Sequence, residues 1–254
     1  MRRVGAMFDA LRTAGGVARS LRIYYGDRRR HEAMDRLYAR FVAPGSLVFD
    51  VGAHVGDRVA AFRRLKARVV AFEPQPALVR TLKVLFGRDD GVVIEPVALG
   101  AFIGHIDFRL NLDNPTVSTA SNDFVAAAKG ARGWDRQDWS RSVQVPITTL
   151  DAMIARYGMP SFIKIDVEGF EADVLHGITH PVAALSFEFT TIQRDVALVA
   201  IDRCVALGLQ SFNAALGESQ TFVFSDWQSV DTIRCWLIGL PDIANSGDIY
   251  AVRE

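Results

Sequence analysis

The chain has 254 residues, half of them apolar, and equal numbers of acidic and basic side chains. This length can bury one substantial core, which favours one domain with an appendage over two equal domains. No apolar stretch reaches the length of a membrane span, and charged residues near the start interrupt any signal-peptide pattern, so we expect a cytoplasmic protein. Cys204 and Cys235 have neither metal nor disulfide spacing and are expected to be reduced and buried.

The first forty residues are basic. They hold ten arginines and four acidic residues, a net charge of +6, which leaves −6 for the remainder of this neutral chain. Apolar residues at helical spacing, with breaks at Gly15-Gly16 and Gly26-Asp27, predict two or three helices within 5–41. The simpler interpretation is a helical face docked on the acidic body; the alternative is peripheral contact with an anionic surface, such as lipid headgroups or an acidic glycan.

From residue 46 onward the pattern alternates between strands and helices. Pro44-Gly45 predicts a turn into the first strand. Predicted strands lie at 47–51, 68–73, 91–98, 161–166, 183–190 and after Gly208, and predicted helices lie at 57–66, 76–87, 170–177 and 193–207. This order predicts an α/β fold with a doubly wound, mostly parallel sheet at 46–254, preceded by a helical extension at 1–45.

The turn after the first strand has the features of a nucleoside-cofactor site. Gly52 and Gly56 are four residues apart, which does not match the glycine spacing that binds a dinucleotide pyrophosphate, and no P-loop is present. Asp50 before the turn suits a cofactor that carries a cationic amino group, as S-adenosylmethionine does. Glu73 ends the second strand, where its two oxygens suit the ribose hydroxyls, and Pro74 fixes the turn behind it.

The alternation fails between Gly100 and Leu150. Residues 104–110 and 142–148 have the period-2 pattern of two strands, which together predict an inserted β-hairpin. They enclose a polar segment at 111–141 that contains Ser118, Trp134 and Trp139. A segment of this length inside a compact domain is typical of a lid or binding loop, and its tryptophans favour a lid.

Acidic residues gather at the end of the predicted strand 161–166. Lys164 and Asp166 are two residues apart and share one face of the strand, so this cation and carboxylate are expected to be paired or functional. Asp166 and Glu168 are the best-placed general bases, although Glu168 is equally suited to cap the following helix. Glu188 is a further acid near the end of the next strand. No carboxylate and histidine cluster indicates a metal site.

These motifs resemble, in their order, those of FkbM-type methyltransferases. The resemblance spans about residues 46–190, and the block at 164–171 is its most specific part. The matching segments are Phe49-Asp50-Val51-Gly52-Ala53-His54-Val55-Gly56-Asp57, Ala71-Phe72-Glu73-Pro74, Val97-Ala98-Leu99-Gly100, Thr149-Leu150-Asp151 and Lys164-Ile165-Asp166-Val167-Glu168-Gly169-Phe170-Glu171. His54 stands where the family usually carries Asn, and an imidazole can replace an amide as donor or acceptor.

The resemblance implies a class I methyltransferase with a Rossmann-like sheet whose last strand, 246–252, enters antiparallel. It implies S-adenosylmethionine as cofactor, with adenine beside Val97 and Ala98. The implied cofactor-binding residues are Asp50, Gly52, Ala53, His54, Gly56, Glu73, Pro74, Val97 and Ala98. Lys164, Asp166 and Glu168 are the expected catalytic residues, Glu188 and Ser118 the expected acceptor-binding residues, and no metal is expected.

The function that follows is O-methylation of a hydroxyl on a sugar, glycan or polyketide-like metabolite. The alternatives are an N-methyltransferase and a non-catalytic subunit or scaffold that binds S-adenosylmethionine. We expect a small-molecule or glycan acceptor and no nucleic-acid partner. The sequence leaves the oligomeric state open.

Overall fold

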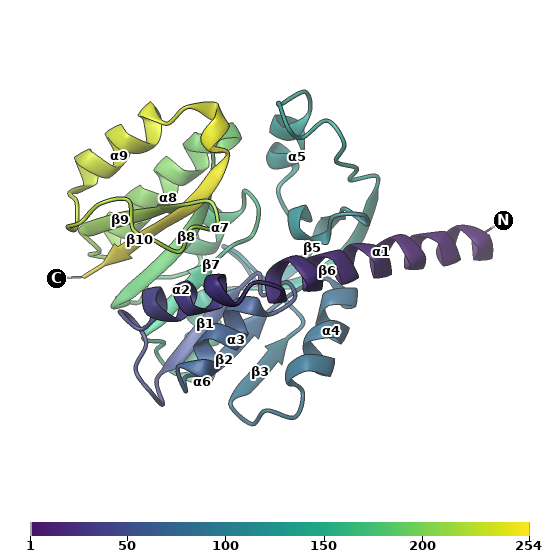
Figure 1. Cartoon of the computed structure of the whole chain (residues 1–254), viewed down its shortest axis with the longest axis horizontal. Helices are drawn as coiled ribbons and strands as arrows, with labels where there is room; N and C mark the ends of the chain where they lie inside the picture. Colours follow the sequence, from purple (N-terminus) through teal and green to yellow (C-terminus); the bar gives the residue numbers. More distant parts are fainter. Residues whose placement is uncertain (1, 254) are drawn as a thin grey trace.

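A computed structural model describes residues 2–253 and contains a large mixed sheet (Figure 1). In the described residues this sheet has seven strands in the order β3-β2-β1-β7-β8-β10-β9. β10 is antiparallel to both of its neighbours, and the other pairs are parallel, which confirms the predicted mostly parallel sheet and its antiparallel last strand. The strands are β1 (Leu47–Val51), β2 (Arg68–Phe72), β3 (Val92–Glu95), β7 (Phe162–Ile165), β8 (Ala184–Thr190), β9 (Ser211–Leu216) and β10 (Ser246–Val252).

Helices cover both faces of this sheet and bury its apolar residues in two clusters. The first cluster packs one face against α6 (Leu150–Tyr157), α7 (Glu171–His176), α8 (Arg194–Ala206) and α9 (Val230–Gly239). The second packs the other face against α2 (Arg28–Tyr38), α3 (Asp57–Arg64) and α4 (Pro76–Phe86). Both faces are therefore dry, as expected for a parallel sheet.

The inserted segment forms a second, smaller sheet beside the carboxyl edge of the large one. Its strands are β4 (Ala98–Leu99), β5 (Gly104–Leu110) and β6 (Arg141–Thr148), and β5 pairs with β6 antiparallel, so the inserted hairpin is confirmed. Between β5 and β6 the chain forms the short 3-10 helix η1 (Pro115–Val117) and helix α5 (Asn122–Ala128). The prediction of one strand at 91–98 is wrong, because the chain leaves the large sheet after Glu95 and joins the small sheet at Ala98.

The basic N-terminal residues form α1 (Arg2–Tyr25) and α2. The predicted break at Gly15-Gly16 is wrong, since α1 runs through it. Gly16 is buried, and a Cβ there would lie 2.7 Å from Pro115, so this glycine permits close approach to η1 instead of ending the helix. The real break is at Asp27, whose side chain accepts hydrogen bonds from the first backbone N–H groups of α2.

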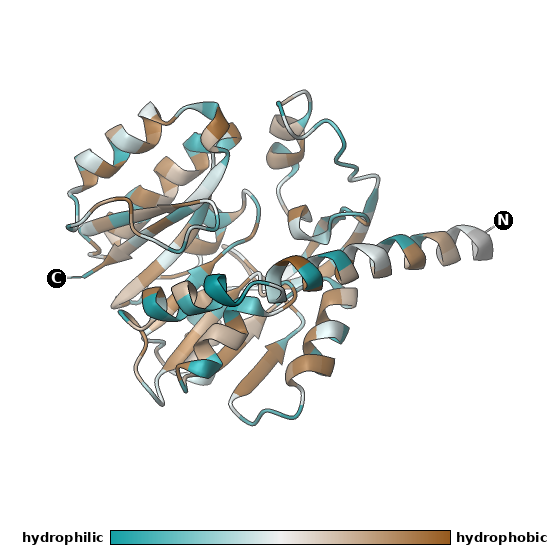
Figure 2. Cartoon of the chain, viewed as in Figure 1, coloured by the Kyte–Doolittle hydropathy of each residue, from teal (hydrophilic) through white to brown (hydrophobic). Residues whose placement is uncertain are grey.

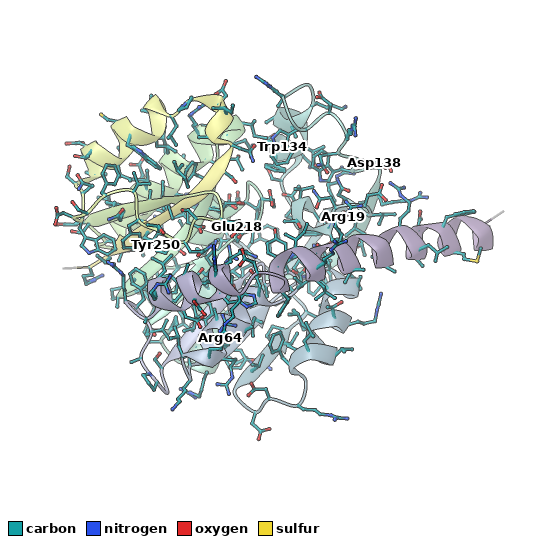
Figure 3. All side chains as sticks on the ribbon, in the orientation of Figure 1. Arg19, Arg64, Trp134, Asp138, Glu218 and Tyr250 are labelled. Carbon is teal, nitrogen blue, oxygen red and sulfur yellow. The ribbon has the colours of Figure 1, made fainter. Side chains whose placement is uncertain are left out.

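Arginines of the extension pair with acids of the body, as the simpler interpretation predicts. Arg12 of α1 contacts Asp113 at 2.6 Å, and Figure 3 shows Arg19 on the side of α1 that faces the insertion. Arg30 of α2, which is almost fully buried, lies 3.0 Å from Asp57 and 2.8 Å from Glu218. These contacts fix α1 and α2 to three separate segments of the fold.

Helices α5, α6 and α9 and one cysteine were not predicted correctly from the sequence. α6 and α9 fall in segments to which we assigned no structure, although Thr149 and Ser229 cap them with side-chain oxygens. Cys204 is buried as expected, but Cys235 is exposed on α9. Among the described residues, none of the helices combines the length and apolar character needed to cross a bilayer.

The turn after β1 depends on a glycine. Gly52 has φ +83°, and a Cβ at this position would lie 1.8 Å from the backbone oxygen of Asp166. This close approach joins the turn after β1 to the turn after β7. Gly45 is a matched comparison, because its φ is +82° but a Cβ there would meet no atom within 4 Å.

Gly52→Ala should therefore lower the free energy of unfolding by more than Gly45→Ala does. Gly45→Ala introduces only backbone strain, which costs about 1 kcal/mol. Gly52→Ala adds an overpacking cost of about 1–3 kcal/mol, because the new Cβ would meet the backbone of Asp166 and not a flexible side chain. Urea unfolding of both variants measures the difference, and equal losses would show that the Asp166 backbone yields freely.

Candidate active site

A cleft lies at the carboxyl ends of β1, β2 and β7, where they meet the small sheet. The space between its walls amounts to about 500 Å³, part of which is open to solvent. Its lining contains nine of the predicted site residues: Gly52, His54, Glu73, Pro74, Val97, Ala98, Ser118, Asp166 and Glu168. Ligands gather at this edge of open α/β sheets, so the position agrees with the prediction.

Glu73 holds the turn after β1 in place. Its Oε2 accepts the backbone N–H of His54 at 2.9 Å, and its Oε1 accepts that of Gln75 at 2.8 Å. A carboxylate has about four acceptor positions, so each oxygen retains capacity for a hydroxyl of a ligand. Burial raises the pKa of Glu73 to about 8, although the two backbone N–H groups oppose the rise. Glu73 is thus both a structural acceptor and a wall of the cleft.

Asp50, Ala53 and Gly56 do not line the cleft. Asp50 is fully buried on β1 beneath the turn, and neither of its oxygens accepts a hydrogen bond from another described residue. Burial and the charge of Asp57 raise the pKa of Asp50 to about 7. Direct contact between Asp50 and a ligand in the cleft is therefore not supported by this arrangement. Ala53 and Gly56 shape the turn from outside the lining.

His54 shapes the turn and also closes the cleft. Its φ of 49° is left-handed, a conformation that Asn also tolerates. The ring of Tyr24 from α1 packs edge-on against the imidazole at 5.3 Å between centroids, and Nε2 lies 3.4 Å from Oγ1 of Thr116. Burial lowers the pKa of His54 to about 4, so the ring is neutral near pH 7. This neutral state suits a structural donor or acceptor.

The opposite end of the cleft is apolar. Val97, Ala98 and Leu99 supply the chain that passes from the large sheet to the small one, and Phe108 and Phe170 complete this end. Ser118 also lines the cleft, but its Oγ accepts the backbone N–H of Asn111 at 3.0 Å. This flat apolar surface fits the predicted place for adenine.

Lys164 lies fully buried in the middle of the sheet. Its Nζ is 3.1 Å from Asp166 Oδ2, which confirms the predicted pairing, and 2.7 Å from Asp248 Oδ1 of β10, which the sequence did not indicate. Burial alone would lower the pKa of Lys164, but Asp166 and Asp248 outweigh it and raise that pKa above its ordinary value. Lys164 is therefore a permanent cation that fixes two carboxylates.

Asp166, Glu168 and Glu188 form an acidic cluster, with carboxylate oxygens within 4.8 Å of one another. These acids come from the turn after β7 and from β8, and they are the three that the sequence analysis assigned to catalysis and acceptor binding. Burial would raise the pKa of Asp166, but the Lys164 ammonium prevails and lowers it. Burial and the charge of Asp166 raise the pKa values of Glu168 and Glu188 well above their ordinary value. Asp166 is thus the charged member, and the two glutamates hold protons more readily.

No side chain among the described residues caps the start of α7, and Glu171, its first residue, instead holds the turn that precedes the helix. Oε1 of Glu171 accepts the backbone N–H groups of Val167 at 3.1 Å and Gly169 at 3.2 Å. The alternative role of Glu168 as a helix cap is therefore wrong. Its carboxyl lines the cleft, and its backbone is left-handed with φ 55°. The hydroxyl of Thr119 donates to the backbone oxygen of Glu168 at 2.7 Å, so the insertion helps to hold this conformation.

A family model described as the methyltransferase FkbM domain matches residues 50–223, more than half of the chain. The chain belongs to the FkbM methyltransferase family. This agrees with the sheet order, the antiparallel β10 and the cleft at the carboxyl ends of the strands. The protein is accordingly an enzyme of the methyltransferase class with a Rossmann-like fold.

Among known proteins, this FkbM-family chain is similar to the hexuronic acid methyltransferase AglP of Haloferax volcanii. The two are 26% identical over 174 residues, which cover 67% of this chain and 65% of AglP, slightly under two thirds of that relative. Two solved structures also align. A TehB-like SAM-dependent methyltransferase from Corynebacterium glutamicum has 11% identity, 87% and 88% coverage of the two chains and a TM-score of 0.43. Fibrillarin from Aeropyrum pernix with bound S-adenosyl-L-methionine has 10% identity, 84% and 68% coverage and a TM-score of 0.43.

Thr119→Val tests how the insertion supports Glu168. The change keeps the size of the side chain but leaves two buried groups without a partner, the backbone oxygen of Glu168 and the backbone N–H of Ser121. The free energy of unfolding should fall by about 2 kcal/mol. Thr81→Val is the control, because the Thr81 hydroxyl only donates to a carbonyl within its own helix. Chemical denaturation of both variants gives the comparison, and similar small losses would contradict a supporting role for Thr119.

Proposed function

We propose that this protein transfers a methyl group from S-adenosylmethionine to a hydroxyl of a sugar, and that a hexuronic acid within a glycan is the first acceptor to test. The charge of the cleft lining carries the cofactor part of the proposal. Among the described lining residues the charged side chains are Glu73, Asp166 and Glu168, all acidic, with no lysine or arginine. The printed activity of AglP, which is similar to this chain, supports the choice of acceptor.

The lining fits a cofactor with cationic groups. S-adenosylmethionine carries a sulfonium and an ammonium, whose charges are favoured by Asp166, and by Glu73 and Glu168 when they are ionised, whereas the pyrophosphate of a dinucleotide would be repelled. The carboxylate of Glu73 retains acceptor capacity for ribose hydroxyls, and the apolar end at Val97 and Ala98 accepts an adenine face. The same charge pattern favours the methyl donor over its demethylated product, which lacks the sulfonium charge.

When bound, S-adenosylmethionine would supply a methyl group activated by its positive sulfur. The residues of this chain would then align the acceptor and accept its proton. Of the two general bases that the sequence analysis predicts, Glu168 fits the role better than Asp166. Lys164 holds the pKa of Asp166 down and so makes it a weak base, whereas the pKa of Glu168 is raised. Asp166, fixed by Lys164, would orient the hydroxyl.

Two alternatives keep parts of this chemistry. An N-methyltransferase would use the same donor, and a base with a raised pKa would also serve to deprotonate an amine, so the choice of oxygen over nitrogen depends on the similarity to AglP. A non-catalytic subunit would need only the binding end of the cleft. The orientation of Glu168 and Asp166 into the lining supports catalysis over that role.

The deciding experiment offers labelled S-adenosylmethionine and acceptors in matched pairs. Glucuronate-containing oligosaccharides are compared with the same oligosaccharides carrying glucose, and with amino sugars, and mass spectrometry locates the label. We expect an O-methyl group on the uronate-containing acceptor. Label on nitrogen would favour the N-methyltransferase, and cofactor binding by calorimetry with no transfer to any of the pools would favour the non-catalytic role. Absence of binding would overturn the proposal.

Cofactor affinity should depend on the proton of Glu73. The ionised carboxylate accepts hydroxyl hydrogen bonds better than the protonated acid, so affinity should strengthen as the pH rises through about 8, the pKa of Glu73. Glu73→Gln keeps the shape but removes this titration, so its affinity should be weaker, by on the order of tenfold, and flat over that range. Calorimetric titrations at several pH values test this. A Glu73→Gln profile parallel to that of the parent would assign the titration to another group.

Glu168→Gln tests the base. It should lower kcat about 10²–10⁴-fold with little change in cofactor affinity, because proton transfer is lost while the lining keeps its shape. Glu188→Gln is the matched control, since Glu188 belongs to the acidic cluster but not to the cleft lining.

The parent enzyme should gain kcat/KM as the pH rises through an apparent pKa above 4.5, the ordinary glutamate value, because the base must lose its proton. Glu188→Gln removes a neighbouring negative charge, so its profile should shift to lower pH while its maximal rate stays near that of the parent. If Glu188→Gln loses activity and Glu168→Gln does not, the roles of the two glutamates are reversed.

A further inference from the structure

A large apolar groove lies between α1 and α4, outside the cleft. The space along it amounts to about 1410 Å³, part of which is open to solvent. From α1 it is lined by Ala10, Thr13, Ala14, Val17, Ala18 and Leu21, and from α4 by Pro76, Ala77, Arg80, Thr81, Val84 and Leu85. These α1 residues recur at helical spacing, so they form one stripe along the helix. The protein thus presents an open apolar face.

The apolar stripe continues beyond the body of the protein. Figure 1 shows α1 projecting past α4 toward the N-terminus, and Met7 and Leu11 extend the stripe at the same spacing, with 57% and 62% of their surfaces exposed. Across the groove, Val84 is 84% exposed and Leu85 is 44% exposed, on a helix that is largely hydrophobic in Figure 2. Contiguous exposed apolar residues of this kind mark an interaction surface.

The charges around the groove are basic. Arg80 lies in the lining, Lys83 and Arg22 are exposed on the two helices, and none of the three has an acidic partner among the described residues. The lining contains no acidic residue, and α4 has none along its length. The acids nearest on α1 and the insertion are already paired, Asp9 with Arg141 and Asp113 with Arg12.

We propose that this face of α1 and α4 docks on the surface of an anionic lipid bilayer. Exposed apolar side chains would enter the boundary between headgroups and acyl chains, while the arginines and lysine contact anionic headgroups. A second copy of this chain would bring the same basic residues against one another, so charge complementarity favours lipid. Gln75 lines both the groove and the cleft, so docking here would hold the active site beside the membrane surface.

Sedimentation with vesicles tests the apolar part of this proposal. The full chain should bind vesicles of phosphatidylcholine with phosphatidylglycerol and should not bind vesicles of phosphatidylcholine alone. Val84→Glu should reduce binding at least tenfold, because it places a carboxylate in the apolar boundary. Ile243→Glu is the matched control, since Ile243 is 82% exposed on η3 (Asp242–Ala244) and the same change there should leave binding intact. Circular dichroism and cofactor binding confirm that both variants are folded.

Charge variants test the basic part. Replacing Arg80 and Lys83 with Gln should weaken vesicle binding by about fivefold for each charge, and added salt should weaken the parent in the same way. Lys129→Gln with Arg132→Gln removes the same two residue types from the insertion and should have little effect. Equal binding by Val84→Glu and Ile243→Glu, or no dependence on phosphatidylglycerol, would overturn the proposal. A dimer in sedimentation velocity that Val84→Glu dissociates, without vesicle binding, would assign the face to a second copy.

Discussion

The geometry of the site depends on one buried ammonium. Lys164 is fully buried in the central strand β7, and a desolvated charge of this kind is tolerated only with close, well-oriented partners. Asp166, directly after β7, and Asp248 on β10 supply them at 3.1 Å and 2.7 Å. Since β8 lies between β7 and β10, the ammonium of Lys164 reaches across β8 and links β7 to β10. This contact fixes Asp166, whose charge in turn raises the pKa values of Glu168 and Glu188.

The register of the sheet explains why these groups share one side. Asp50, Lys164, Ser186 and Tyr250 occupy one row across β1, β7, β8 and β10, so their side chains point to the same face. Asp166, Glu188 and Asp248 follow two residues further along the same face. The opposite face, packed by α6 to α9, is apolar throughout its buried cluster. The buried polar residues of the central strands β1, β7, β8 and β10 therefore lie on the side that α2 and α3 cover, whereas Glu95 of the edge strand β3 lies on the other face and pairs with Arg156 of α6.

Much of this arrangement could be predicted from the sequence, because its causes are local. The strand and helix alternation, the hairpin at 104–148 and the Lys164–Asp166 pair depend on spacing along the chain, whereas the antiparallel last strand was implied only by the resemblance. The rest depends on contacts between distant segments. Asp248 is 84 residues from Lys164, and nothing at Ser246–Val252 indicates a buried cation. Glu168 suits a helix cap by position, but α7 begins without a side-chain cap and Glu171 holds the turn that precedes it, which spacing alone does not indicate.

The extension and the insertion both contact the turn after β1. Tyr25 of α1 donates to the backbone oxygen of Val55 at 3.1 Å, and Tyr24 packs against His54. The same helix is held to the insertion by Arg12, and the insertion reaches Glu168 through Thr119. A movement of α1 would therefore displace residues at two places in the cleft. One is the turn near Glu73, and the other is Glu168, which we propose as the base. Because the Arg12 pair is partly exposed, it adds little to stability by itself. Its position, between the helix and the insertion, makes it instead a determinant of how the two parts are oriented.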